Sequence, residues 1–423
     1  MADILDHIPS FEDLRVDDAQ VLAFEAAREA LAAPGDIPAE EIELGVVVRL
    51  DRGFPMVTTA GGARFRAEHA VTFAKGKHKK RGGRQASAGR GAGRKGGTAG
   101  RGGARGRDGS GAREAAATAD AVALERSGAA ATCVGDADAG QLLPAVGDAV
   151  AVRVAPGHDM GVILQVLPRR TSFERWRGKN RGERQVLAAN VDVIFIVQPL
   201  GAERDTLALM RDRVARSLVL ARDCGAVPVV VLTKADRCEA AEVAHIVEEL
   251  RRLCGPDVRV VATSSRTGEG LSEVRSCVPR GVCAMILGES GAGKSTLLNT
   301  LLGTNALETN EVRARDDAGR HTTVARIMVA LPDPCGVIAD CPGLRSLPLV
   351  GHERGLARAF PEVVEAACAC RFNDCTHTHE PGCAVREGVE AGEIEPSRAE
   401  AFLALAAEMR VSAQSLDPDV HVG

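Results

Sequence analysis

The pattern of hydrophobic and polar positions changes along the chain and predicts three folded parts after an N-terminal extension. Residues 19–31 have the periodicity of an amphipathic helix, and an acidic segment with Pro and Gly follows them. From Ile42 onward, short alternating segments are interrupted by Gly and Asp, which is typical of the strands of a small β-barrel. We therefore assign residues 1–40 to an extension and residues 41–168 to a barrel, with an insert at about residues 73–140.

A different pattern begins after residue 168 and continues to residue 346. Near-continuous apolar runs, which are expected of parallel strands buried on both faces, alternate with helical patterns. The runs are residues 191–199, 227–232, 258–263, 283–287 and 336–340. This alternation predicts an α/β doubly wound sheet over residues 169–346. Residues 347–423 hold a Cys/His cluster and a helical stretch at residues 397–413, so we predict a helical C-terminal domain.

The composition is that of a globular protein, with 45% hydrophobic and 26% charged residues. No apolar run approaches the length of about 18 residues that a membrane span needs. The acidic N-terminus lacks the charged and then apolar pattern of a signal peptide. Most of the 12 Cys sit singly among aliphatic residues, so we expect no disulfide framework. We expect a cytoplasmic monomer without membrane contact.

The formal net charge of −4 conceals one strongly basic segment. Residues 75–113 hold 13 Lys or Arg and 14 Gly but a single acidic residue, Asp108. Their only apolar residues are Ala, so we predict that the segment buries too little surface to fold and is disordered. A solvated loop is one interpretation. We favour charge-driven binding of a polyanion, RNA above all, without sequence-specific readout.

A P-loop motif lies between an apolar strand and a helical pattern, which is the context that this motif requires. Its glycines let backbone N–H groups converge on phosphate oxygens at a helix N-terminus. We expect Lys294 to neutralise the β- and γ-phosphates, and the Ser295 hydroxyl to coordinate Mg²⁺. The predicted phosphate-binding residues are Gly288, Glu289, Ser290, Gly291, Ala292, Gly293, Lys294, Ser295 and Thr296.

The ends of two further predicted strands carry residues that can support Mg²⁺ and bind the γ-phosphate and the base of a nucleotide. Asp340 can support the Mg²⁺ shell, and Gly343 leaves its N–H free for the γ-phosphate. Asp236 can accept hydrogen bonds from the ring N–H and the exocyclic amine of guanine, a donor pair that adenine lacks. The predicted base-side residues are Thr233, Lys234, Ala235 and Asp236, with Ser264 and Ser265 in a second loop. A plain polar turn is the alternative for that second loop.

Four residues near the C-terminus have the spacing of a metal site, and they are Cys370, Cys375, His377 and Cys383. Three thiolates and one imidazole suit tetrahedral Zn²⁺ in a closed structural site, one ion per chain. Cys368 and His379 lie close enough in the sequence to substitute for a ligand. Reduced surface cysteines are the alternative interpretation.

The order of the nucleotide motifs is unusual, because the base motif at Asp236 precedes the P-loop Lys294. A circular permutation explains this order, since a sheet keeps its contacts when its termini move to another exposed loop. The order TKAD, SSRTGEG, GESGAGKST, GRHTT, DCPG and then the Cys/His cluster resembles the ribosome small-subunit-dependent GTPase family (RsgA, also called YjeQ). The resemblance covers roughly residues 41–385. One departure is Thr233 in place of the more usual Asn, although a hydroxyl there can still brace the neighbouring loop.

The resemblance implies an OB-fold barrel, a circularly permuted P-loop GTPase domain and a zinc-binding C-terminal domain. It also implies a role in late maturation of the small ribosomal subunit, with binding to its rRNA and GTP hydrolysis stimulated by the subunit. GTP and GDP would be the ligands, with Mg²⁺ accompanying GTP.

The same resemblance assigns roles within the segment GRHTT. Thr323, in preference to Thr322, would sense Mg²⁺ and the γ-phosphate, and His321 would aid hydrolysis. Leu344 stands where many GTPases place a water-orienting Gln, so another group or the ribosome has to assist. The candidate catalytic residues are His321, Lys294 and Thr323, and the candidate magnesium ligands are Ser295 and Thr323.

Our leading hypothesis is a GTP-hydrolysing assembly factor for the small ribosomal subunit. The alternative is a non-enzymatic RNA-binding protein whose nucleotide-binding fold is vestigial. A P-loop kinase would need an acceptor site, and no feature of the sequence suggests one. Intact Lys294, Ser295, Asp340 and Asp236 favour the GTPase.

Overall fold

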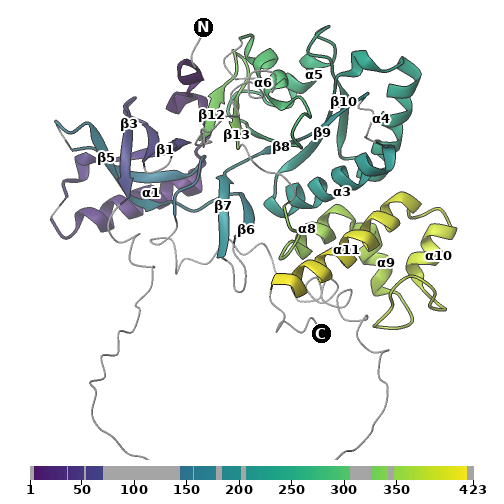
Figure 1. Ribbon diagram of the computed structural model, residues 1–423. Coiled ribbons are helices and arrows are strands. Elements are labelled where there is room, and N and C mark those ends of the chain that lie inside the picture. Colours follow the sequence, from purple (N-terminus) through teal and green to yellow (C-terminus); the bar gives the residue numbers. More distant parts are fainter. Residues whose placement is uncertain are drawn as a thin grey trace, which may run out of the picture.

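The structure is a computed structural model, which describes residues 4–35, 37–51, 54–69, 143–155, 157–177, 183–201, 206–304, 325–341 and 347–416. A β-barrel lies to one side of a central α/β part, and the C-terminal helices lie below the central part in Figure 1. The hydrophobic core runs from the central part into the C-terminal helices. The predicted domain boundaries therefore stay a prediction.

Five strands close into the barrel. β1 (Ile42–Leu50) pairs with β2 on one side and β4 on the other, while β3 and β5 complete the ring. The other strands are β2 (Pro55–Thr59), β3 (Arg64–His69), β4 (Ala149–Arg153) and β5 (Met160–Val166). Small aliphatic side chains fill the interior, namely Val47, Val57, Ala67, Val150, Val152, Ile163 and Val166, all fully buried. The predicted barrel is confirmed, and the predicted insert at about residues 73–140, with its basic segment 75–113, lies outside the described residues.

The predicted N-terminal helix is present as α1 (Asp18–Ala32), which packs on the outside of the barrel. Its Phe24 and Ala27 are buried against Ile42 and Leu44 of β1. Three short 3-10 helices flank it, namely η1 (Ile4–His7), η2 (Phe11–Asp13) and η3 (Ala39–Glu41). Ile8 lies in the core of the central part. The extension is therefore built into the fold and touches both neighbours.

The central part contains the predicted parallel sheet, in the order β10-β9-β8-β11-β13. Its strands are β8 (Val193–Pro199), β9 (Val227–Thr233), β10 (Arg259–Ala262), β11 (Cys283–Leu287) and β13 (Val337–Asp340). The helices are α3 (Leu207–Cys224), α4 (Ala240–Cys254), α5 (Leu271–Ser276) and α6 (Lys294–Leu302), with a 3-10 turn η6 (Ala235–Arg237). α3 and α4 lie on one side of the sheet, and α5 and α6 lie on the other (Figure 1).

The barrel and the central sheet are continuous, which the sequence pattern does not indicate. β12 (Arg326–Ala330) runs antiparallel to β13 and also pairs with β1, through Arg49 opposite Ile327 and Leu50 opposite Arg326. The result is one sheet of 11 strands. A separate hairpin of β6 (Ser172–Arg177) and β7 (Glu183–Ala189) connects the two parts along the chain.

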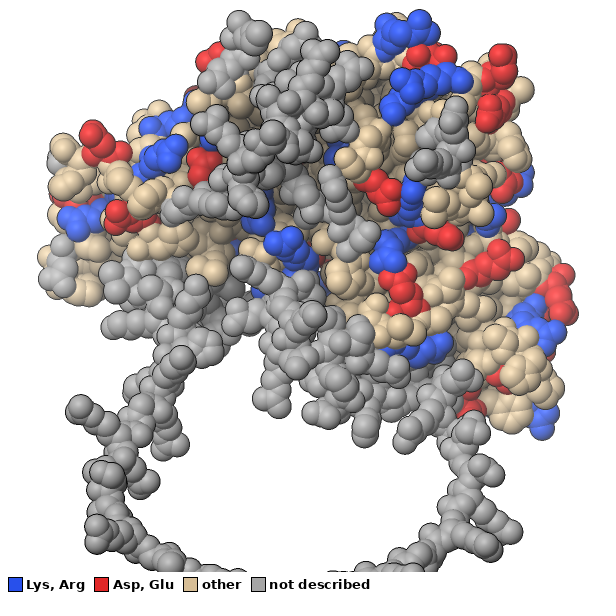
Figure 2. Space-filling view, in the orientation of Figure 1, with Lys and Arg blue, Asp and Glu red and all other residues tan. Residues whose placement is uncertain are grey.

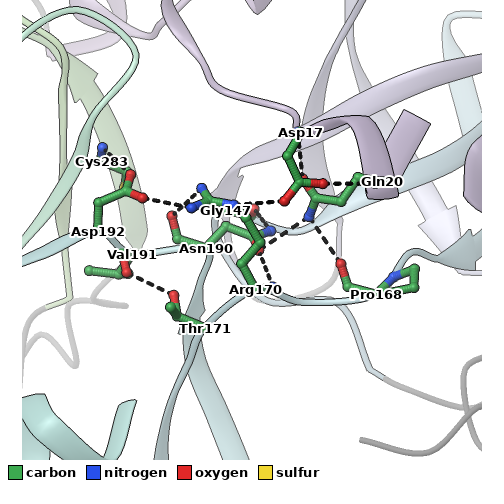
Figure 3. A network of polar contacts seen from close by, with 10 residues as sticks. All are labelled: Asp17, Gln20, Gly147, Pro168, Arg170, Thr171, Asn190, Val191, Asp192 and Cys283. Carbon is green, nitrogen blue, oxygen red and sulfur yellow. Dashed lines mark hydrogen bonds and ion pairs between the residues drawn. The ribbon is translucent and has the colours of Figure 1, made fainter. Parts of the chain in front are cut away.

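Arg170 joins the N-terminal extension to the central part through its guanidinium group (Figure 3). It donates to the carboxylate of Asp192 (Nη1 to Oδ1, 2.7 Å) and lies 3.5 Å from the Asp17 carboxylate. The other Asp192 oxygen accepts the backbone N–H of Cys283 at the start of β11 (2.9 Å). The joint is thus tied to the strand that leads into the P-loop.

Asn190 makes a second set of contacts in the same joint (Figure 3). Its side-chain oxygen accepts from the backbone N–H of Arg170 (2.9 Å) and from the Gln20 amide (3.2 Å), and its amide donates to the carbonyl of Gly147 (2.8 Å). Its φ of 56° is in the left-handed region, which Asn tolerates better than most residues. Burial of this side chain is therefore compensated by hydrogen bonds.

The described residues of the C-terminal part form four helices, α8 (Glu353–Ala359), α9 (Pro361–Cys368), α10 (Ala384–Glu390) and α11 (Pro396–Leu416). Of these, α8 packs against α3, and α11 packs against α3 and α4 of the central part (Figure 1). The helical stretch predicted at residues 397–413 lies within α11. None of the helices in the described ranges is long and apolar enough to cross a membrane.

Candidate nucleotide-binding and metal sites

The predicted P-loop connects β11 to α6, and α6 begins at Lys294. Gly288 has φ of 156°, and a Cβ atom there would lie 2.5 Å from the carbonyl oxygen of Val197 on β8. Gly293 has φ of 87° and packs closely against Thr233. Only glycine fits these two positions without strain, so the loop needs its glycines for shape. The first backbone N–H groups of α6 are left to face a phosphate.

Lys294 lies across the mouth of this loop. Its ammonium group donates to the carbonyl oxygens of Gly288 (2.7 Å) and Glu289 (2.6 Å). The side chain of Glu289 forms an ion pair with Arg213 on α3 (3.0 Å). The Lys294 ammonium thus lies at the loop where a phosphate chain would lie, while the charge of Arg213 is balanced by Glu289. The contact of Arg213 could not be predicted from the sequence, because a lone Arg in a helical pattern carries no motif.

The base loop after β9 is bonded directly to the P-loop. The buried Thr233 hydroxyl donates to the carbonyl of Ala292 (2.7 Å), and the Lys234 ammonium donates to the carbonyl of Gly291 (2.9 Å). Thr233 therefore braces the neighbouring loop as we expected of a hydroxyl in place of Asn. The contact holds the base-side and phosphate-side loops at a constant spacing.

Asp236, on the η6 turn, has both carboxylate oxygens engaged. Oδ1 accepts from the Ser264 hydroxyl (2.6 Å), and Oδ2 accepts from Nε of Arg266 (2.8 Å). The hydrogen bond from Ser264, and then that from Arg266, holds the pKa of Asp236 below its ordinary value. The group is therefore a carboxylate at neutral pH, as an acceptor of two guanine N–H groups has to be. Ser265 is half-buried beside Ser264 in the same loop.

Asp340 ends β13, and β13 runs parallel to β11 with Met285 opposite Ala339. Because the carboxyl ends of parallel strands meet at one edge, Asp340 lies at the same edge as the P-loop. The structure thus brings the P-loop, the base loop, the Ser264 loop and Asp340 to one end of the sheet. The remaining predicted residues, His321, Thr323 with its alternative Thr322, and Gly343, lie outside the described residues.

The four predicted metal ligands come together. The ligand atoms of Cys370, Cys375, His377 and Cys383 all lie within 4.8 Å of one another. Nδ1 of His377 is 3.5 Å from the sulfur atoms of both Cys370 and Cys383, so this nitrogen faces the cluster. Cys368 and His379 are exposed and stand outside the cluster. Cys368 and His379 are therefore not part of the ligand cluster in this structure.

The chemistry of this cluster fits a metal ion. Cys375, His377 and Cys383 are almost completely buried. Burial raises the pKa of the Cys375 thiol to about 12 and also raises that of Cys383. A cation at the centre would stabilise the thiolates and reverse this shift. Four soft donors around one point suit a metal that prefers sulfur and nitrogen.

The turn that holds the ligands is built by Glu380. Its carboxylate accepts backbone N–H groups from Thr376 (3.0 Å), Thr378 (3.1 Å) and His379 (3.2 Å). Burial acts to raise the pKa of Glu380, but the Thr376 hydroxyl and these backbone groups lower it far more. A permanent carboxylate thus shapes the loop, and His377 takes the left-handed backbone (φ 62°) that turns its ring inward.

Comparisons with known proteins identify the family of this chain. The model of the RsgA GTPase family matches residues 166–350. A "Small ribosomal subunit biogenesis GTPase RsgA" from Xanthomonas euvesicatoria is 42% identical over 254 residues, which cover 60% of this chain and 68% of the relative. One of the same name from Streptomyces avermitilis is 43% identical over 251 residues, covering 59% of this chain and 66% of the relative.

Two solved structures share the fold. YjeQ from Thermotoga maritima has a TM-score of 0.54 at 22% sequence identity, covering 87% of this chain and 99% of its own. YloQ, described as a circularly permuted GTPase, has a TM-score of 0.52 at 17% identity, covering 88% of this chain and 96% of its own. A motif order in which the base loop precedes the P-loop is therefore compatible with a known fold, that of a circularly permuted GTPase. The P-loop is hydrogen-bonded to the base loop, and a relative at 42% identity is named an RsgA GTPase. The chain is therefore a GTPase that belongs to the RsgA family.

Proposed function

We propose that this GTPase acts in biogenesis of the small ribosomal subunit, by binding GTP across the joined loops and hydrolysing it when the subunit is bound. The role in subunit biogenesis comes from the names of its relatives. The observation that carries the nucleotide assignment is the pair of hydrogen bonds from Thr233 and Lys234 to the P-loop backbone. They support a single site in which Asp236 would bind the base and Lys294 would bind the phosphates.

Guanine selection in this proposal falls to Asp236. Its carboxylate is deprotonated and reachable, with 16% of the side chain exposed. Guanine offers two N–H groups to it, whereas adenine would leave the carboxylate facing an unprotonated ring nitrogen. Ser264 and Ser265 belong to the loop that lies beside the base. The alternative of a vestigial nucleotide fold is disfavoured by membership of a GTPase family.

Hydrolysis in this proposal needs residues beyond the P-loop. Lys294 would neutralise phosphate charge, and Ser295 with Thr323 would hold Mg²⁺, which supplies charge neutralisation of the triphosphate. His321 would orient or deprotonate the attacking water, because Leu344 cannot do so. A site that lacks a built-in water-orienting group depends on its partner, and this accords with stimulation by the ribosomal subunit.

We assign one structural Zn²⁺ to Cys370, Cys375, His377 and Cys383. The support is that four donors converge on one point and that three of them are buried. Four protein ligands leave no position for a reacting water, so the ion would hold the C-terminal part together and take no part in hydrolysis.

Contacts with rRNA would rest mainly on charge. Basic and acidic side chains are intermixed over the described residues in the view of Figure 2. The strongest excess of positive charge in the sequence is at residues 75–113. Deleting residues 75–113 should flatten the dependence of subunit binding on salt, because fewer counterions are released. A pelleting assay with purified subunits across salt concentrations measures that slope, and an unchanged slope would remove the insert from the proposal.

The central experiment measures GTP turnover with and without small ribosomal subunits. We expect slow hydrolysis by the protein alone, strong stimulation by the subunit, and loss of both in Lys294→Ala. ATP should fail to compete with GTP. Stimulation by large subunits alone, or equal competition by ATP, would contradict the proposal. Repeating the pelleting assay with a non-hydrolysable GTP analogue and with GDP tests the expected preference for the GTP state.

A further inference from the structure

We propose that Arg266 determines the affinity of the guanine site by competing with the base for Asp236. Its guanidinium group occupies the carboxylate in the structure, and it has to leave when guanine binds. The inference rests on the proposed function, since it takes Asp236 as the residue that reads guanine.

The two hydrogen-bond donors to the Asp236 carboxylate differ in burial, since one lies in the protein interior and the other is exposed to solvent. Ser264 is completely buried and donates to Oδ1 from the protein side (2.6 Å). The side chain of Arg266 is 74% exposed and donates through Nε to Oδ2 (2.8 Å). Arg266 therefore covers the solvent side of the carboxylate. A base that enters from solvent has to approach through that side.

The bond from Ser264 does not depend on the Arg266 side chain. The Ser264 oxygen accepts the backbone N–H groups of Arg266 and Thr267, each at 3.2 Å. These bonds orient the hydroxyl toward Asp236 and persist whatever side chain stands at position 266. A substitution of Arg266 thus removes the cover from the carboxylate and leaves its support in place.

The competition has a defined size and a defined sensitivity to salt. An exposed ion pair is weak, so freeing Asp236 should tighten nucleotide binding by about two- to fivefold. Salt screens such a pair, and the gain should therefore shrink as the ionic strength rises. The same contact gives the carboxylate a replacement partner at the moment GDP leaves, which favours release.

The test is calorimetric titration of the full chain with GDP at low and high salt. Arg266→Ala should bind GDP about two- to fivefold more tightly at low salt, and Arg266→Lys should lie between this variant and the original protein. Arg237→Ala is the matched control, because it removes an exposed positive charge from the same turn region without touching Asp236. Unchanged or weaker binding by Arg266→Ala would overturn the proposal.

A second background separates competition from direct contact with the base. In Asp236→Asn the guanidinium has no carboxylate to pair with, and the amide can donate to the carbonyl that xanthine carries in place of the guanine amine. Adding Arg266→Ala to this variant should leave its affinity for xanthosine diphosphate unchanged. An effect as large as that on GDP would show that Arg266 touches the base, which overturns competition. Equal affinity of the original protein for ADP and GDP would instead overturn the guanine assignment, and the proposal with it.

Discussion

Backbone hydrogen bonds between two strands join the central part to the barrel, whereas contacts made by side chains join it to the C-terminal helices. On the barrel side, β1 pairs with β12, and Arg170 and Asn190 make a buried polar network beside that pairing. Backbone hydrogen bonds commit two strands to one register, and a shift by one residue would turn every side chain to the other face. This joint fixes where the barrel stands relative to the P-loop strand.

On the C-terminal side, the described residues contribute no strand to the sheet, and docking combines the shared hydrophobic core with a few charged side chains. Arg398 of α11 donates to the carbonyls of Leu253 (2.9 Å) and Ala359 (2.8 Å) and binds Glu362 through two nitrogens. Arg216 of α3 donates to the carbonyl of Leu347 (3.0 Å). Single substitutions can therefore loosen this joint, whereas the barrel joint should resist them.

The largest expected effect comes from the metal ligands. Cys375→Ser should abolish zinc binding, and the C-terminal helices should lose their protection from hydrogen exchange, because metal binding supplies folding free energy of about 10 kcal/mol in small zinc domains. GDP affinity should stay almost unchanged, since the barrel joint and the central sheet remain. Elemental analysis of zinc per chain and exchange mass spectrometry provide the readouts.

The control for that experiment is Cys368→Ser, since Cys368 is exposed and outside the cluster. It should keep one zinc per chain and normal protection. Retention of zinc by Cys375→Ser, or loss of zinc in both variants, would contradict the ligand assignment. A redox-active iron in place of zinc would contradict it as well.

Arg398→Ala should have the next largest effect. The side chain is only 10% exposed, and its guanidinium also stacks 5.1 Å from the ring centre of Phe360. Its removal leaves Glu362 and two carbonyls without their donor, a cost of about 3 kcal/mol in the free energy of unfolding. Urea denaturation measures this loss. The exposed Arg386 of α10, changed to Ala, should cost less than about 0.5 kcal/mol, and equal losses in the two variants would count against the docking role.

Arg170→Ala tests the barrel joint in the same way and should cost less than Arg398→Ala. Asp192 keeps its bond to the backbone N–H of Cys283, and β1 stays paired with β12. We expect a loss of about 2 kcal/mol in the free energy of unfolding, within the usual range for a hydrogen bond to a charged group. A loss as large as that of Arg398→Ala, or separate unfolding of the barrel, would refute the contrast between the two joints.

Local pattern was enough to predict the barrel, the parallel sheet and the metal cluster. Alternation in the barrel strands and the apolar runs from residue 191 onward each lie within one element, and the short spacing from Cys370 to Cys383 lies within the one loop between α9 and α10. The P-loop motif and TKAD carry their chemistry in contiguous residues. These features could be predicted because the interactions that define them are close in sequence.

Contacts between distant residues could not be predicted. The pairing of Leu50 with Arg326 and the bond from Gln20 to Asn190 join segments whose local patterns give no sign of one another. The same holds for Arg266, which reads as part of a polar turn until its guanidinium is seen on Asp236. Contacts of this kind form only when folding brings distant segments together. They account for the residues of the candidate site that the sequence did not predict.

The smallest expected effect concerns pH and the C-terminal joint. Asp223 at the end of α3 binds the buried His352 (Oδ2 to Nδ1, 2.7 Å) and Arg354. Burial acts to raise the pKa of Asp223, but His352 and then Arg354 lower it more, so the net pKa lies below its ordinary value of 3.8. A carboxyl with a depressed pKa stabilises the folded state above its unfolded pKa and loses that contribution as the pH falls through the folded pKa. The stability difference between the original protein and Asp223→Asn should therefore shrink as the pH falls below about 4. Urea denaturation of both proteins from pH 3 to pH 5 measures the difference. A difference that grew as the pH fell from 4 to 3 would show that the Asp223 carboxylate does not stabilise this joint.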